Sequence, residues 1–470
     1  MIARYIYTIL IFLAFLPGCM MGPNYQKPTM NNPEAFIYDS LQRDTDVNLV
    51  WWEMFQDEQL HELINIALIE NRNVRIAASR IEEARAYYGF TMADIYPWIN
   101  YNARYTQQNF DPNSGATGDA FGLGVGGINL NWEIDFWGKY RRANESARAE
   151  MLASEYGQRA VQVALISEVA NTYFMVLMLD MKLEISRNTL RSREESLRII
   201  QERFNKGYSA EIDLNQSQVQ MNIAKASIPL YERILVMSKN RLSVLLGRNP
   251  GNITIGNALY DQVLPPEIPA GLPSDLLVRR PDIQEAEQLL IAQNARIGVA
   301  EAMRFPSISL TGLLGGVSPD LSGFSTAWSV GGSVAGPLFN FGKNKRRVEI
   351  EQQRTIQAQN YYENTVLQAF QEVENALIEI HTLKDEFRAR KAQMDAAANA
   401  AMLSRERYNG GVTSYLEVLD SDRTLFNSEL SAASTKQQQF AAYIKLYKAL
   451  GGGWITQEER DQAENMSKGQ

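Results

Sequence analysis

Apolar and polar residues alternate with a period of two in two stretches of the chain, 98–110 and 121–137. This period places apolar side chains on one face of a β-strand and polar side chains on the other. The pattern returns more weakly in 306–316 and 326–338, and turn-forming residues separate the members of each pair. In the second stretch the apolar positions are Ile128, Leu130, Trp132, Ile134 and Phe136. The sequence therefore predicts four amphipathic strands.

Helical sequence surrounds these strands. Helices are predicted over 57–95 and 275–304, and each segment ends at an aromatic–proline pair, where proline disfavours further helix. After the strands, the predicted hairpins 139–247 and 342–450 each open with 66 residues that contain no proline. A helix of that length spans about 100 Å. Glycines then mark a turn in each hairpin, and a second helix returns.

The two halves of the chain are copies of one unit. Several motifs recur at a constant offset of 204 residues, and upstream of the strands the offset between Pro97 and Pro306 is 209. Self-similarity over such a distance is typical of tandem structural repeats. The matched motifs are DFWGKYRR and FNFGKNKRR, EVAN and EVEN, RFNKG and RYNGG, and the Leu-Gly pairs at 246–247 and 450–451.

These patterns predict the organisation of the chain. We expect a mixed protein that combines long α-helices with amphipathic strands. The predicted segments in chain order are a signal peptide at 1–18, an extended segment at 19–56, repeat 1 at 57–260, repeat 2 at 261–454 and a C-terminal tail at 455–470.

The N-terminus has the features of an export signal. Arg4 precedes an apolar core, 6–16, that is too short to span a bilayer. The sequence LPGC follows, and Cys19 is the only cysteine. This arrangement resembles the lipobox of bacterial lipoproteins, which implies cleavage before Cys19 and covalent lipid on that residue. An ordinary signal peptide with an incidental cysteine and an uncleaved anchor are the alternatives.

Composition argues against several functions. The formal net charge is −8 and no basic block is present, so a nucleic-acid partner is not expected. The two histidines, His61 and His381, lie far apart, so we expect no metal site. Nucleotide-binding loops and catalytic triads are also absent from the sequence, and we expect neither an enzyme nor a cofactor other than the lipid.

The strand pattern fits either a soluble sandwich or a membrane barrel. In a membrane, four strands cannot close a barrel, because the smallest bacterial barrels have about eight, and open edges are not tolerated in lipid. A membrane location would therefore require a dimer or a trimer, and only the larger barrel leaves room for a channel. The long hairpins would form either a hollow cylinder or a solid coiled-coil bundle.

Five further motifs, read in order, point to a family: MGPNYQKP at 21–28, LLGRNPG at 245–251, RRPDIQEAEQ at 279–288, YLEVLDSDR at 415–423 and LYKALGGGW at 446–454. Together with the repeat and the lipobox, they resemble the TolC/OprM-like outer-membrane factors of tripartite RND-type efflux systems, in their lipoprotein branch.

The resemblance implies a homotrimer in the outer membrane of a Gram-negative bacterium. Its twelve-stranded β-barrel, four strands from each chain, would continue into a long periplasmic α-helical barrel. A mixed equatorial domain would be built from 19–70, 248–275 and 451–470. A periplasmic adaptor (membrane fusion) protein and an inner-membrane RND-type pump would be its partners, together with outer-membrane lipid. The chain would passively export drugs and other small toxic compounds. A duct for type I protein secretion and a non-conducting coiled-coil lipoprotein are the alternatives.

The same resemblance assigns a periplasmic gate to Leu416, Asp420 and Arg423. These positions are i, i+4 and i+7, which lie on one face of a helix. The simpler interpretation is that Asp420 and Arg423 form an ordinary surface pair. Repeat 1 has Asp213 and Gln216 in the corresponding region, so the two copies differ here.

The glycine-containing turns of the two predicted hairpins, called the tips below, are candidate adaptor contacts. Glycine in such a turn is also a common helix terminator. The basic runs GKYRR at 138–142 and GKNKRR at 342–347 are expected to anchor the strands to the helices and to contact anionic headgroups. The candidate tip residues are Lys206, Gly207, Tyr208, Ser209, Gly410, Gly411, Val412 and Thr413.

Overall fold

The computed structural model describes residues 20–30, 33–38, 51–110, 117–266, 273–319, 321 and 323–452. The predicted signal peptide, Cys19 and the tail at 455–470 lie outside the described residues. In chain order the elements are η1 (Trp51–Met54), α2 (Glu58–Glu70), α3 (Arg72–Ala93), β1 (Trp98–Phe110), β2 (Thr117–Ile134), α4 (Lys139–Asn205), α5 (Glu211–Leu245), η2 (Leu259–Asp261), α6 (Pro273–Arg279), α7 (Pro281–Ala302), β3 (Ser307–Ser318), β4 (Ser325–Ala335), α8 (Lys343–Asn409) and α9 (Tyr415–Ala449).

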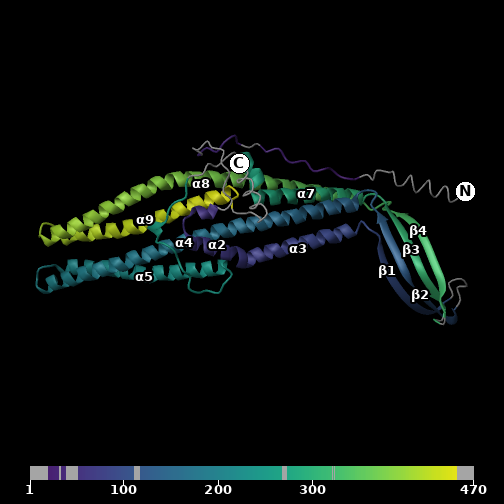
Figure 1. The fold of residues 1–470 in the computed structure, drawn as a ribbon, viewed down its shortest axis with the longest axis horizontal. Helices are drawn as coiled ribbons and strands as arrows, with labels where there is room; N and C mark the ends of the chain where they lie inside the picture. The colour runs from purple at the N-terminus through teal and green to yellow at the C-terminus, as the bar shows by residue number, and fades with distance from the viewer. Residues whose placement is uncertain are drawn as a thin grey trace, which may run out of the picture. The chain divides into compact units, whose positions relative to one another are not determined.

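The repeat is visible in the lengths of the elements. Helices α3 and α7 have 22 residues each, α4 and α8 have 67 each, and α5 and α9 have 35 each. Figure 1 shows α4 beside α5 and α8 beside α9, and ion pairs such as Arg187–Glu232 and Lys445–Glu379, each at 2.7 Å, hold the members of each pair together. The chain is therefore mostly helical, with two long antiparallel hairpins.

The compact units of the structure do not coincide with the repeats. Unit 1 contains residues 1–30, 80–155 and 285–363, and unit 2 contains the rest of the chain. Each unit thus combines parts of both repeats. The predicted segment 19–70 is also divided, because residues 20–30 belong to unit 1 whereas 51–70 belong to unit 2.

Unit 1 contains one antiparallel sheet with the strand order β1-β2-β3-β4 (Figure 1). Strands β2 and β3 join the two repeats, and their register pairs Ile128 with Leu314. Residues directly opposite one another in an antiparallel pair lie on the same face. The apolar positions of the four strands consequently form continuous rows across the sheet.

Some boundaries differ from those predicted. The expected helix 275–304 is two helices, α6 and α7, because Pro281 starts a new helix at its first position. Strand β2 ends at Ile134 rather than at 137, since Asp135 turns to cap α4. Strand β4 ends at Ala335 rather than at 338, because Pro337 cannot donate a ladder hydrogen bond.

The core of unit 2 contains stacked aromatic residues among its aliphatic side chains. Phe174 and Phe440 stack with ring centroids 4.2 Å apart, and Trp51 stacks on Tyr447 at 5.1 Å. Asp57 lies at the same core, where it accepts hydrogen bonds from Tyr173 and Gln262, both at 2.6 Å. The segments 51–70 and 248–266 are thereby fixed to the long helices.

One described helix, α4, contains an 18-residue window apolar enough to cross a membrane, with mean hydropathy 1.4. However, 67% of that window is buried inside the protein. Packing against the aromatic core of unit 2, where Val169, Ala170 and Phe174 are fully buried, accounts for this apolar stretch.

Candidate functional site

Both hairpin turns have the same backbone geometry. Gly207 has φ +79° and Gly411 has φ +73°, a left-handed conformation that glycine adopts without strain. In each turn, the N–H of the residue after the glycine donates to a carbonyl of the last helical turn, as in a Schellman motif. These bonds are Tyr208 to Arg203 at 2.8 Å and Val412 to Arg407 at 2.9 Å. The glycines therefore end α4 and α8 in the same way.

The residues at the turns project into solvent. Tyr208 is 81% exposed and Val412 is 69% exposed. Lys206 is also exposed, while Ser209 and Thr413 are half-buried. Each hairpin therefore ends in one exposed apolar side chain, which is suited to contact with another protein. The adaptor contact stays a prediction for these tips.

The three candidate gate residues lie together on one exposed face of α9. Leu416 is 61% exposed, and the side chains of Asp420 and Arg423 are each 61% exposed. Arg423 donates from Nη2 to Asp420 Oδ1 at 2.5 Å. Within one chain, the charged residues form the surface pair that their i, i+3 spacing permits.

The opposite face of α9 explains this orientation. Tyr415, Val418 and Leu419 are buried against Ile200 of α4 and Leu214 of α5. This apolar cluster holds the two hairpins together near their tips. Because α9 buries that face, Leu416, Asp420 and Arg423 must point away from the rest of the chain.

Glu417 is held differently from its neighbours. Arg407 of α8 pairs with Glu417 at 3.2 Å, and the Thr413 hydroxyl also donates to Glu417. In repeat 1 the corresponding Arg203 instead lies over the ring of Tyr408, 4.7 Å from its centroid. The turn of repeat 2 is therefore closed by an ion pair, and no corresponding pair is found at the turn of repeat 1 among the described residues.

A partly buried polar network lies below the tips and was not predicted from the sequence. Arg405 pairs with Asp422 at 2.9 Å and donates to the Ser192 hydroxyl at 3.0 Å. Arg193, only 3% exposed, donates to the carbonyl of Gln220 at 2.6 Å, and burial lowers the pKa of this guanidinium. The network connects α4, α5, α8 and α9. A sequence signal exists, since Asp422 is two residues from Asp420 and so lies on another face of α9.

The RRPD motif has a structural role. Arg280 donates to the carbonyl of Ala449, the last residue of α9, at 3.0 Å, and it pairs with Glu372 at 2.8 Å and Asp282 at 2.7 Å. In repeat 1, 209 residues earlier, Asn71 donates to the carbonyl of Leu245 at 2.8 Å. Each residue therefore satisfies a free carbonyl at the end of a return helix.

A buried arginine in unit 1 holds the N-terminal segment. Arg142 is 2% exposed and donates to the carbonyls of Met21 at 2.9 Å and Gly22 at 3.1 Å. The N–H of Met21 donates to the carbonyl of Trp137 at 3.1 Å. These bonds fix the start of the described chain at the connection between β2 and α4. Cys19, the predicted lipidation site, lies outside the described residues but only one position before Met20.

Within the described ranges, no group of three or more His, Cys, Asp or Glu side chains is placed to hold a metal ion. His61 is committed to structure, because its Nε2 lies 2.7 Å from the carbonyl of Phe55 and 3.0 Å from that of Trp52.

Comparison with known proteins identifies the family of the chain. The family model described as outer membrane efflux protein matches residues 63–248 and 272–452. The cation efflux system protein CusC of Escherichia coli is 35% identical over 453 residues, which cover 93% of this chain and 96% of CusC. The toluene efflux pump outer membrane protein TtgC of Pseudomonas putida is 34% identical, with 94% of each chain covered.

Solved structures give the same result. The CmeC outer membrane channel of Campylobacter jejuni matches with a TM-score of 0.87 and 26% identity, covering 96% of this chain and 98% of CmeC. The resemblance to outer-membrane factors of efflux systems is confirmed, and with it the location in the outer membrane. The chain belongs to the outer membrane efflux protein family.

Proposed function

We propose that this protein is the outer-membrane exit duct of a tripartite efflux pump, through which small toxic compounds pass from the periplasm to the exterior. Three copies form a twelve-stranded β-barrel that continues into a barrel of α-helices. The duct itself is passive, and the inner-membrane pump supplies the energy.

The apolar face of the sheet is the observation that carries this proposal. The register places Tyr101, Ile128, Leu314 and Trp328 in one row across all four strands. All four are exposed, from 53% for Ile128 to 89% for Tyr101. A contiguous apolar surface of this kind is unfavourable in water and requires a cover. Lipid supplies that cover, and Tyr and Trp suit its interfaces.

The polar face of the sheet supports the same orientation, in which the apolar face contacts lipid. Asn100 pairs in register with Asn129, and the Asn129 amide donates to the Asn102 side chain at 2.7 Å. Further along, Glu133 lies opposite Ser309, and Ser309 lies opposite Ser333. A sheet with one apolar face and one polar face is suited to separate lipid from a water-filled lumen.

The sheet edges require more than one chain. Strands β1 and β4 are each paired on one side only within the described residues. Lipid cannot satisfy the free N–H and C=O groups of an open edge. Pairing β4 of one copy with β1 of the next removes both edges, and three copies give a barrel wide enough for a lumen.

We assign the periplasmic gate to Leu416, Asp420 and Arg423. Their shared exposure on α9 leaves them available to line a pore once three copies assemble. Each chain would contribute one apolar, one acidic and one basic side chain to successive rings. The Asp420–Arg423 pair can then exchange partners between neighbouring chains, which would link the three tips when the duct is closed.

The partners follow from the same assembly. We propose that the tips at Lys206–Ser209 and Gly410–Thr413 contact a periplasmic adaptor, which connects the duct to an RND-type pump. The relatives named for cations and for toluene share the family of this chain. We therefore infer that the choice of exported compound is made outside the duct. Lipid on Cys19 would anchor the N-terminal segment, which Arg142 holds beside β2.

The test is the oligomeric mass of the detergent-purified protein combined with its conductance in planar bilayers. A mass of three chains and discrete channel events are expected. A monomeric mass, or a trimer without conductance in any gate variant, would contradict the proposal. In a deletion strain, normal drug tolerance together with loss of a secreted protein would instead favour a duct for protein secretion.

A further inference from the structure

The two connections between strand and helix in unit 1 have the same backbone but different charges. The connection from β2 to α4 turns at Gly138, with φ +77°, and the connection from β4 to α8 turns at Gly342, with φ +81°. In both, the arginine four residues later donates its N–H to the glycine carbonyl, at 2.9 Å for Arg142 and 3.0 Å for Arg346. The side chains around the turns can therefore be compared position by position.

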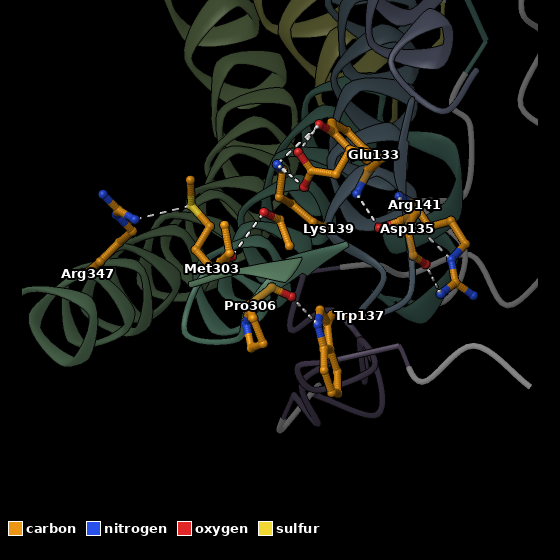
Figure 2. A network of polar contacts seen from close by, with 11 residues as sticks. Glu133, Asp135, Trp137, Lys139, Arg141, Met303, Pro306 and Arg347 are labelled. Atoms are coloured by element: carbon orange, nitrogen blue, oxygen red, sulfur yellow. Dashed lines mark hydrogen bonds and ion pairs between the residues drawn. The ribbon is translucent and has the colours of Figure 1, made fainter. Parts of the chain in front are cut away.

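In repeat 1 the cations after the turn are neutralised by acids before it. Lys139 pairs with Glu133 at 2.8 Å, and Arg141 pairs with Asp135 at 3.2 Å (Figure 2). Asp135 also accepts hydrogen bonds from the backbone N–H groups of Tyr140 at 3.1 Å and Arg141 at 2.9 Å. It thus supplies negative charge at the N-terminus of α4, where the helix dipole favours an anion.

Repeat 2 keeps the cations and lacks these acids. At the offset of 204 residues, Pro337 and Phe339 stand where repeat 1 has Glu133 and Asp135. Lys343 and Lys345 replace Lys139 and Arg141, and Arg347 stands where repeat 1 has Ala143. The junction of repeat 2 consequently has one more cation and two fewer acids than that of repeat 1.

The protein compensates for this charge only in part. Arg346 pairs with Glu349 at 2.6 Å, and Lys345 approaches the same carboxylate at 3.9 Å; both cations are 76% exposed. Arg347 donates to the sulfur of Met303 at 3.3 Å, as Figure 2 shows. Within the described ranges, Lys343 has no charged partner. No acidic residue lies in the first turn of α8, so its cations face the positive end of the helix dipole.

Exposed apolar residues lie directly before these cations. Phe339 is 75% exposed and Phe341 is 89% exposed, with their ring centroids 4.6 Å apart. Leu338 is fully exposed. Aromatic rings followed by lysine and arginine are the combination that anchors membrane proteins at the level of the headgroups. The segment also follows β4 immediately, at the end of the apolar face assigned above to lipid.

We propose that the junction at 336–347 binds the phosphate groups of anionic phospholipids. The aromatic side chains enter the headgroup region, and Lys343, Lys345 and Arg347 contact the phosphates, which take the place of the acids that repeat 2 lacks. Repeat 1 forms no such site, because its cations are already paired. This inference rests on the proposed placement of the sheet in a bilayer.

The experiment compares two lipids around the purified full-length protein in phosphatidylcholine bilayers. Spin-labelled phosphatidylglycerol and spin-labelled phosphatidylcholine are added separately, and their association with the protein is measured by electron paramagnetic resonance. We expect the wild type to prefer phosphatidylglycerol by roughly fivefold or more, since each cation near a charged headgroup contributes about that factor. The triple variant K343Q/K345Q/R347Q should show a preference close to one.

Two further variants sharpen the result. Phe339→Asp restores the acid that repeat 1 has at this position, so it should also reduce the preference while every cation remains. The control variant replaces three exposed cations of unit 2, Lys225, Arg388 and Lys391, by glutamine and should keep the wild-type preference.

Equal association of the two lipids with the wild type would overturn the proposal, as would an unchanged preference in the triple variant. Loss of the trimer mass in that variant would also overturn it, because the junction would then be a subunit interface. Conductance is recorded in parallel. A conducting protein without lipid preference would refute only this inference, whereas absence of conductance in the wild type and in the gate variants alike would refute the proposed duct.

Discussion

The two repeats have nearly the same backbone and different surface chemistry. Repeat 1 pairs its junction cations with its own acids, whereas repeat 2 leaves Lys343 without a charged partner in the described part of the chain. At the tips, repeat 2 places the charged residues Asp420 and Arg423 on an exposed face, where repeat 1 has the neutral Gln216 in place of Asp420. Duplication thus preserved the turns and helix lengths, while the exposed charges at the junctions and tips came to differ between the repeats.

The largest expected difference between the repeats is in the loss of stability on replacing Asn71 or Arg280. Both donate to the last carbonyl of a return helix, but Arg280 is also a buried charge with two carboxylate partners. Removing it leaves Glu372 and the carbonyl of Ala449 without their partner. We expect Arg280→Ala to lower the free energy of unfolding by about 3 kcal/mol. Asn71→Ala should cost about 1–2 kcal/mol, because it removes a helix cap and one hydrogen bond.

Apparent unfolding midpoints of the detergent-purified variants, recorded at one scan rate, provide the measurement. Arg280→Lys serves as a control that keeps the charge but not the forked geometry, and it should fall between the wild type and the alanine variant. Equal losses for Asn71→Ala and Arg280→Ala would show that the carbonyl contact, rather than the ion pairs, carries the effect.

A smaller difference is expected at the strand–helix junctions. Asp135 is nearly buried and caps the N-terminus of α4, so Asp135→Ala should cost about 1–2 kcal/mol. Phe339 occupies the corresponding position of repeat 2, but it is exposed, and Phe339→Ala should change the unfolding midpoint very little. A large loss from Phe339→Ala would mean that the ring packs against protein in the assembled molecule.

The smallest difference is expected at the tip glycines. Gly207 and Gly411 have positive φ, and a Cβ atom at either position would meet nothing within 4 Å. Only the left-handed backbone opposes a side chain, so Gly207→Ala and Gly411→Ala should each cost about 1 kcal/mol. Hydrogen exchange of the N–H groups of Tyr208 and Val412 reports this local loss. Unequal acceleration at the two tips would show that one turn is held by contacts outside the chain.

Much of the fold could be predicted from sequence. The long helices could be predicted because these stretches contain no proline. The turns at the tips could be predicted because glycine adopts the left-handed conformation that ends a helix. The position of Leu416, Asp420 and Arg423 on one face follows from helical periodicity alone. These features depend on local sequence, so they needed no knowledge of packing.

The remaining features depend on contacts between distant segments. Arg142 and Arg346 occupy equivalent positions in the two repeats, yet the first side chain is 2% exposed and the second is 76% exposed. The N-terminal segment causes this difference, because it packs on Arg142, and no pattern in residues 20–30 predicts that. The shared role of Asn71 and Arg280 could not be predicted for a related reason. Both donate to the last carbonyl of a long helix, but with different side chains, so the two sequences do not match at this position.

Single-channel conductance of a gate variant tests the central claim most directly. We expect that D420A/R423A, which removes the charged pair of α9, conducts more than the wild type and admits larger antibiotics. The matched variant Q216A/V219A changes the positions 204 residues earlier, in repeat 1, and should conduct like the wild type. Equal conductance of D420A/R423A and the wild type, or an increase confined to Q216A/V219A, would contradict the assignment of the gate to repeat 2.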